Sequence, residues 1–267
     1  MILLTGHKGF IGTNFHKFLP KESEILLVEK EDSFQFLKEF QKWNTITLVI
    51  HQGAISNTLE TNEKQINSYN YEFTIELFKK FINSSTVIKY ASSASVYGNS
   101  KNGYDPLNLY SKSKLDIDNW VIENIDYFNQ IQGFRYFNVY GENEYSKIKL
   151  NQSSPISKFL NDAKKFNEIK IFKNSNNMRR DFVYVKDVVD IVLNNNKESG
   201  IYDLGTTFTY SFAEVAELIS DYTGAKVVEI EFPELLIGKY QFHTRSKENW
   251  GGYKFKTIED YLENLMI

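Results

Sequence analysis

Residues 1–12 read MILLTGHKGFIG, an apolar run that leads directly into three glycines at a spacing of three. The run MILLTG is typical of a buried strand, and segment 10–19 carries apolar side chains at helical spacing. Gly6, Gly9 and Gly12 therefore lie where a strand gives way to a helix. Glycines there let a dinucleotide pyrophosphate approach the amides of a helix N-terminus. By itself, the spacing also suits a tight turn that binds nothing.

Strand-like runs alternate with helical patterns along the chain. The further runs are EILLVEK, TLVIHQGA, VIKYASSASVYG and GFRYFNVYG, at residues 24–30, 47–54, 87–98 and 133–141. Apolar residues recur at helical spacing over 66–81 and 115–125. Continuous apolar strands alternating with helices predict a parallel sheet covered on both faces, which is a doubly wound α/β fold.

The segment between Glu29 and the strand at Leu48 is short. It has room for one helix, at about residues 34–43, where a full mononucleotide-binding half places helix, strand and helix. We therefore expect a Rossmann-like sheet that is shortened around its third strand. The polar stretches 142–154 and 172–180 are expected to be long loops. The pattern is irregular after Thr206, as expected for a small second lobe.

Composition narrows the functional classes. The chain has 267 residues, of which 42% are hydrophobic. It has no cysteine, which excludes disulfides and thiolate chemistry. Its net charge of −3 gives no reason to expect nucleic acid as a partner. No apolar run approaches the roughly 20 residues of a membrane span, and no secretory signal is evident, so a cytoplasmic protein without membrane association is the default expectation. The four histidines show no ligand spacing, which predicts no metal, and His51 is expected to be a hydrogen-bonded core residue.

Glu29 ends the second strand-like run. A carboxylate there can accept hydrogen bonds from the adenine-ribose hydroxyls, and it would repel a 2′-phosphate, which favours NAD. Lys30 next to it could offset this repulsion, so NADP stays open. The alternative is that Glu29 is a solvated strand end.

A second group of residues follows the fourth strand-like run. SSASVYG at 92–98 precedes YSKSK at 110–114, which places Tyr110 and Lys114 on one face of a helix. A nearby ammonium lowers the pKa of a phenol and lets it accept a proton, while a serine from the strand end holds the substrate oxygen. Alone, Tyr-x-x-x-Lys is a common accident of helix sequences; behind a glycine loop and a serine cluster it indicates a redox site.

The combination of TGxxGFIG, SSxxVYG, YxxxK and RYFNVYG resembles the extended short-chain dehydrogenase/reductases, the NAD-dependent epimerases and dehydratases of nucleotide sugars. HQGAISNT, INSYNYEFTIELF, RRDFVYVKDVVDI, SGIYDLGT and GKYQFHT are similar to one branch, the ADP-L-glycero-D-manno-heptose 6-epimerases of lipopolysaccharide synthesis. The resemblance covers nearly the whole chain apart from the shortened segment after Glu29. It implies an NAD(P)-binding domain at 1–145 plus 180–206 and a substrate-binding lobe at 146–179 plus 207–267.

The resemblance implies roles for individual residues. Ser93, Tyr110 and Lys114 would be catalytic, and Lys147, with Lys149 close by, would be a second catalytic lysine. The expected cofactor contacts are Gly6, Gly9, Phe10, Ile11, Gly12, Glu29, Lys30, Gln52, Gly53, Ala54, Ser56, Asn70, Lys114 and Val139. The expected substrate contacts are Ser93, Asn138, Ser154, Asn161, Phe172, Lys173, Asn174, Ser175, Arg180 and Tyr240. The family has histidine at the position of Asn161.

Two of the substrate contacts have structural alternatives. Arg180 suits a pyrophosphate because a guanidinium donates two parallel hydrogen bonds, but it could instead form an ion pair with Asp181. Tyr240 could be ordinary aromatic packing.

The expected reaction is epimerisation. Dehydratases follow the catalytic-strand hydroxyl with an acidic pair, whereas Ala94, Ser95 and Val96 provide no carboxylate here. One tightly bound NAD or NADP per subunit would oxidise a sugar carbinol transiently and then return the hydride. A nucleotide-sugar 4-epimerase or a keto-sugar reductase is the alternative, and a non-catalytic NAD(P)-binding protein is a third. Relatives associate through helices in 63–82 and 110–127, which implies a homo-oligomer.

Overall fold

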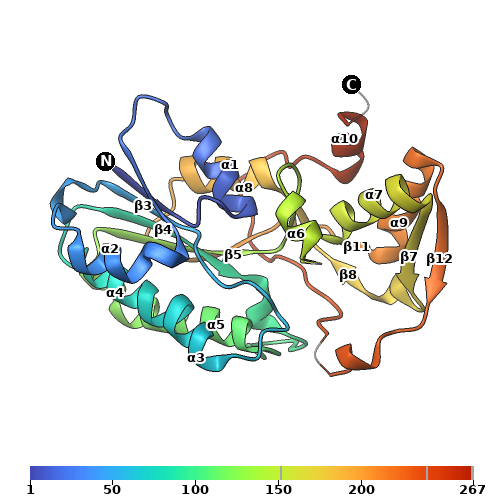
Figure 1. Cartoon of the computed structure of the whole chain (residues 1–267), viewed down its shortest axis with the longest axis horizontal. Coiled ribbons are helices and arrows are strands. Elements are labelled where there is room, and N and C mark those ends of the chain that lie inside the picture. Colours follow the sequence, from blue (N-terminus) through green and yellow to red (C-terminus); the bar gives the residue numbers. More distant parts are fainter. Residues whose placement is uncertain (151, 239, 266–267) are drawn as a thin grey trace. The chain divides into compact units, whose positions relative to one another are not determined.

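The computed structural model describes residues 1–150, 152–238 and 240–265. The chain forms two compact units (Figure 1). The first unit contains residues 1–96, 106–135 and 189–202, and the second contains 97–105, 136–188 and the chain from Asp203 on. The functional division expected at 145/146, 179/180 and 206/207 stays a prediction.

A six-stranded sheet forms the centre of the first unit. Its order is β10 (Gly200–Leu204), β5 (Gln130–Tyr136), β4 (Val87–Ser93), β3 (Leu48–His51), β1 (Ile2–Thr5) and β2 (Ile25–Val28). β1 pairs in parallel with β2 and β3, and β3 pairs in parallel with β4. β2 is the edge strand, so the expected absence of the strand beyond it is confirmed among the described residues.

Helices lie on both faces of this sheet (Figure 1). They are α1 (Phe10–Phe18), α2 (Ser33–Glu39), α3 (Glu63–Ile66), α4 (Phe73–Lys79), α5 (Leu109–Asn124) and the end of α8 (Val185–Asn194), with short 3-10 turns η1 (Lys30–Asp32) and η2 (Trp43–Thr45). A π-helical segment, η3 (Asn67–Glu72), interrupts the helix expected over 66–81. Apolar residues of β1, β3 and β4 form one core with those of α4 and α5, among them Leu3, Val49, Ile88, Leu77 and Val121.

The second unit contains three strand pairs. β6 (Asn138–Tyr140) pairs with β9 (Phe182–Tyr184) and β7 (Glu168–Phe172) with β12 (Lys226–Ile230), both in parallel, and β8 (Arg179–Arg180) is antiparallel to β11 (Tyr210–Ser211). Its helices are α6 (Tyr145–Lys149), α7 (Pro155–Phe166), α9 (Phe212–Thr223) and α10 (Ile258–Glu263). α7 packs against α9 and β7.

Two expectations about irregular structure were wrong, whereas the chain after Thr206 belongs to a second compact unit, as expected. The expected loop 142–154 contains α6, and the expected loop 172–180 contains β8. The region after Thr206 contains the regular helix α9, which begins with a capping box of Ser211 and Glu214 and ends at Gly224 with φ +75°. These capping signals are readable in the sequence, but the short strands around them carry too few residues for a periodic pattern.

Candidate active site

The glycine loop joins β1 to α1 and brings backbone segments into close contact. Gly6 has φ +69°, and a Cβ there would lie 2.7 Å from the backbone of Gly53. A Cβ on Gly12 would lie 2.0 Å from the carbonyl oxygen of Gly6. Gly9 begins α1 without a capping side chain among the described residues. The first-turn amides of α1 are therefore available to an anion, so the loop fits a pyrophosphate.

Glu29 lies at the end of β2 and contacts this loop. Its Oε1 accepts a hydrogen bond from the Lys8 backbone N–H at 2.6 Å and lies 3.1 Å from Nδ1 of His7. Burial lowers the pKa of His7, although Glu29 acts in the opposite direction. The carboxylate is thus held beside the glycine loop, as a ribose-binding carboxylate requires.

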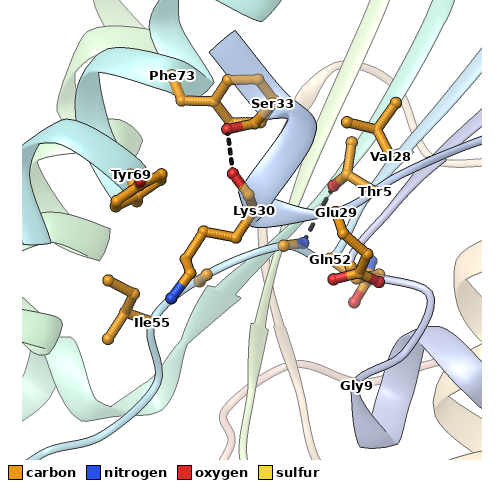
Figure 2. A pocket seen from close by; sticks show the side chains of 13 residues that line it. Thr5, Gly9, Val28, Glu29, Lys30, Ser33, Gln52, Ile55, Tyr69 and Phe73 are labelled. Carbon is orange, nitrogen blue, oxygen red and sulfur yellow. Dashed lines mark hydrogen bonds between the residues drawn. The ribbon is translucent and has the colours of Figure 1, made fainter. Parts of the chain in front are cut away.

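A pocket opens between the glycine loop, the end of β2 and the segment after β3 (Figure 2). It brings together the predicted cofactor residues Gly6, Gly9, Glu29, Lys30, Gln52, Gly53 and Ala54. Ile55, within the stretch 52–56 that was expected to line the cofactor, is also part of it. It further uses residues that sequence reasoning missed, namely Thr5, Val28, Ser33, Tyr69 and Phe73. Tyr69 directly precedes the predicted Asn70, but only the tertiary structure brings its ring to this pocket. Phe10, Ile11, Gly12, Ser56, Asn70, Lys114 and Val139 are not among its lining residues, and their contacts with a cofactor stay predictions.

Asn70 supports the pocket from η3. It is almost fully buried, and its side chain bonds both backbone groups of Ile55, accepting from N–H at 2.8 Å and donating to O at 3.0 Å. It also donates to Oγ of Ser113 at 3.1 Å. Asn70 therefore ties the segment after β3 to α5.

Ser93, Tyr110 and Lys114 lie within the first unit, at the end of β4 and in the first turns of α5. Asn108 caps this helix by accepting from the Ser111 N–H. Lys114 is 2% exposed, and its Nζ donates to the carbonyl of Ala91 at 2.8 Å. The same Nζ lies 5.9 Å from the centre of the Tyr110 ring. Ser93 lies at the end of β4, and its side chain acts to lower the pKa of Tyr110. The catalytic pairing of the two stays a prediction.

Burial dominates the pKa values of this pair. Desolvation raises the pKa of Tyr110, and the side chain of Ser93 only partly offsets this. Desolvation is therefore the dominant effect on the Tyr110 phenol, and the lowering of its pKa by the nearby ammonium stays a prediction. Desolvation also lowers the pKa of Lys114 to about 8, against the opposing charge of Asp118.

A buried polar cluster supports α5 one turn beyond Lys114. Asp118 is fully buried and accepts from the hydroxyls of Tyr90 at 3.0 Å and Ser92 at 2.9 Å. Arg135 of β5 donates to the same carboxylate through Nε at 2.8 Å. β4 and β5 thus hold the helix that carries the Tyr110–Lys114 pair. Sequence reasoning missed this cluster, because its members are distant in the chain.

Arg180 lies in the second unit among aromatic rings. It is 5% exposed, and its guanidinium carbon lies 5.4 Å from the ring centre of Phe212 and 5.3 Å from that of Tyr240. Burial lowers the pKa of Arg180, opposed by a hydrogen bond with Tyr240. The alternative that Tyr240 is ordinary aromatic packing is supported in part, because its ring centre also lies 5.4 Å from that of Phe232.

The ion-pair alternative for Arg180 is wrong. Asp181 is fully buried and accepts from the backbone N–H groups of Thr206 at 2.7 Å, Thr207 at 2.9 Å and Ser246 at 3.0 Å. No salt bridge joins it to Arg180 in the described part of the chain. The guanidinium therefore remains uncompensated by this neighbouring carboxylate.

The other predicted substrate residues are also in the second unit, together with the predicted cofactor contact Val139 and the predicted catalytic Lys147. Asn138 and Val139 lie in β6, Lys147 in α6, Asn161 in α7, Phe172 at the end of β7, and Lys173, Asn174 and Ser175 in the following turn. Ser154 caps α7, and its hydroxyl donates to Glu144 at 2.8 Å. Burial lowers the pKa of Lys147, opposed by Glu144. Lys173 forms an exposed ion pair with Glu231.

Within 1–150, 152–238 and 240–265, no three His, Asp or Glu side chains are grouped so that they could hold a metal ion. In the same residues, no helix combines the length and apolar character that crossing a bilayer requires.

Known proteins resemble this chain in sequence and fold. Residues 2–205 match the model of the NAD dependent epimerase/dehydratase family. An ADP-L-glycero-D-manno-heptose-6-epimerase of Brachyspira hyodysenteriae is 34% identical, over 92% of this chain and 89% of that protein. The crystal structure of the Helicobacter pylori enzyme of the same name has a TM-score of 0.78 at 24% identity, covering 99% of this chain and 94% of that one. Thermotoga maritima UDP-glucose 4-epimerase has a TM-score of 0.82 at 18% identity, covering 98% and 96%.

Proposed function

The chain belongs to the NAD-dependent epimerase/dehydratase family, and on that premise we propose that it is a nucleotide-sugar epimerase acting through transient oxidation of a sugar carbinol. The observation that carries the proposal is the placement of Ser93 at the end of β4 and of Tyr110 and Lys114 in the first turns of α5, with Lys114 buried beside the Tyr110 ring. A non-catalytic NAD(P)-binding protein would have no need to keep this set.

The cofactor pocket fits NAD(P). The glycine loop and the uncapped start of α1 would hold the pyrophosphate, and Glu29 would accept hydrogen bonds from the ribose. NAD(P), when bound, supplies hydride acceptance and return at the sugar carbon and a positive charge that favours a tyrosinate.

The chain's own residues move and hold the proton. Tyr110 Oη takes the proton of the sugar hydroxyl as that carbon is oxidised, and gives it back when the carbonyl is reduced on its other face. Ser93 Oγ hydrogen-bonds the same sugar oxygen and orients it. Lys114 provides positive charge beneath the phenol, and its bond to Ala91 holds it there. Lys147 is the alternative candidate for returning the proton when the carbonyl is reduced on its opposite face.

The proposed substrate is a nucleotide-diphosphate sugar, and ADP-glyceromanno-heptose is the first candidate because of the 34% identical relative. Arg180 and Tyr240 would bind the diphosphate, since the guanidinium has no carboxylate partner in Asp181. A nucleotide-sugar 4-epimerase or keto-sugar reductase is the alternative. The cytoplasmic location stays a prediction.

The test is inversion of ADP-, GDP-, UDP- and dTDP-sugars, monitored by NMR, with protein whose bound NAD(H) or NADP(H) is identified by mass spectrometry. Inversion of one sugar without added reductant supports the epimerase. Consumption of a keto sugar only with added NAD(P)H indicates the reductase. Absence of any NAD(P) binding contradicts the whole proposal.

We also propose a homo-oligomer formed through α3, η3 and α5. A groove between these helices is lined by Ile66, Tyr71 and Leu109 together with charged residues such as Lys112 and Asp116. Light scattering coupled to gel filtration should give a multiple of 31.2 kDa. A monomer at all concentrations would contradict this assembly.

A further inference from the structure

The cofactor pocket lies at the edge where the sheet is shortened. β2 is the last strand on this side among the described residues, and the chain passes from Glu29 through η1, α2 and η2 directly to β3. A longer mononucleotide-binding half has a further strand next to β2, whose end forms one wall of the adenine site. That wall has to come from another part of this chain.

Aromatic residues occupy this side of the pocket. Tyr69 of η3 and Phe73 of α4 line it, together with Ile55 from the segment after β3 (Figure 2). Phe34 of α2 packs behind them, with its ring centre 5.7 Å from that of Tyr69 and 5.9 Å from that of Phe73. Because η3 is π-helical, it departs locally from the regular helical phase of α3 and α4 at the position of Tyr69.

Lys30 covers the Tyr69 ring. Its Nζ lies 5.5 Å from the ring centre, and Figure 2 shows the side chain directed toward Tyr69 and Ile55, away from Glu29. A cation over an aromatic face is held by the ring quadrupole at a modest energy when the site is open to water. The same face would attract a purine ring, which stacks on aromatic side chains regardless of its hydrogen-bonding pattern.

We propose that Tyr69 is the residue on which the adenine ring of the cofactor stacks, and that Lys30 covers this ring face until the purine displaces it. Tyr69 thereby replaces the wall that the missing strand would supply. The proposal rests on the proposed function, because it requires that the pocket receives NAD(P).

Calorimetric titration with ADP-ribose tests the stacking of adenine on Tyr69 without any turnover. Tyr69→Ala should weaken ADP-ribose binding about tenfold or more, whereas Tyr69→Phe should stay close to the unaltered protein. Lys30→Ala should bind at least as tightly, because it removes the group that competes for the ring. Tyr127→Ala, at a 54% exposed position of the same unit and outside the pocket, is the control.

A spectroscopic signature separates stacking from a structural role of Tyr69. The adenine H2 and H8 resonances of bound ADP-ribose should move upfield through the ring current, and this shift should be lost in Tyr69→Leu at saturating ligand. Equal affinity and equal shifts in Tyr69→Leu would overturn the proposal. If ADP-ribose binds and shifts as expected but no sugar is turned over, the stacking on Tyr69 stands and the proposed function fails. If the unaltered protein binds no ADP-ribose, both fail.

Discussion

Glu29 Oε1 accepts the backbone N–H of Lys8 at 2.6 Å, so the end of β2 is joined to the glycine loop by a charge-assisted hydrogen bond. This contact orients the carboxylate at the place where the adenine ribose would lie. It also places a negative charge at the position that a 2′-phosphate would occupy.

We therefore expect NAD(H) to bind more tightly than NADP(H). Like charges brought together in a binding site cost several kcal/mol, which corresponds to a ratio of about tenfold or more. Glu29→Gln should narrow this ratio, mainly by improving NADP(H) binding. Competition between ADP-ribose and its 2′-phosphorylated form measures the ratio directly. Equal affinities in the unaltered protein would contradict the expected role of Glu29.

Tyr110→Phe should abolish most turnover while cofactor binding is retained. The substitution removes only the hydroxyl that exchanges a proton with the sugar, and general acid–base catalysis contributes about 10²–10⁴-fold. Tyr127→Phe is the control, because Tyr127 is 54% exposed in the same unit. The measurements are kcat by NMR and bound cofactor by absorbance. Full activity in Tyr110→Phe would refute the assigned role.

Lys114→Met should remove activity yet raise stability at neutral pH. Burial lowers the pKa of Lys114 from 10.5 to about 8, so the unfolded chain binds more protons between these values. Below pH 8 Lys114 is charged in both states, and the full cost of burying its charge lowers the free energy of unfolding. This cost disappears as the pH rises toward 10.5. By linkage, the charged Lys114 lowers the free energy of unfolding of the unaltered protein by about 3 kcal/mol. The gain in Lys114→Met is smaller than this, because the variant also loses the hydrogen bond to Ala91.

Urea unfolding at pH 7 and pH 10 checks this prediction. The difference in unfolding free energy between Lys114→Met and the unaltered protein should be larger at pH 7. Burial also lowers the pKa of Lys89 to about 8, but Lys89 is present in both proteins, so its contribution cancels in the difference. A difference that does not change with pH would show that burial does not lower the pKa of Lys114 in the folded protein.

His51 should make the protein sensitive to acid. Its Nδ1 lies 2.7 Å from Oγ1 of Thr5, and its Nε2 lies 2.8 Å from Oγ1 of Thr74, whose hydroxyl donates to the Asn70 carbonyl. Nε2 therefore carries the proton and Nδ1 accepts, which confirms a hydrogen-bonded core histidine. Burial lowers the pKa of His51 to about 3, because the charged form is desolvated there.

The unfolded chain binds a proton at His51 below pH 6.5 and the folded chain does not until about pH 3, so stability falls as the pH drops through this range. The loss should be about 2 kcal/mol at pH 5. His51→Gln should have a smaller change in unfolding free energy between pH 7 and pH 5 than the unaltered protein. His16→Gln, at an exposed position of α1, should leave that change as it is.

Local sequence patterns were sufficient to predict several elements of the structure. The apolar run 1–4 and the glycine spacing predicted β1, the turn and α1, because strand burial and the special backbone of Gly6 are set by neighbouring residues. The four-residue spacing of Tyr110 and Lys114 predicted their common helix face for the same reason. The short interval before Leu48 was enough to predict the missing strand, because a chain of that length cannot add one.

The tertiary structure alone decided what surrounds these groups. Tyr69 and Phe73 line a pocket with Glu29, and Arg135 pairs with Asp118, through contacts between segments that no local periodicity relates. It also decided the pKa values, since desolvation in the folded chain raises the pKa of Tyr110. Burial and long-range contact depend on how the whole chain packs. The sequence by itself therefore determined which chemical groups are available and in which local geometry, and the packing decided their neighbours and their charge.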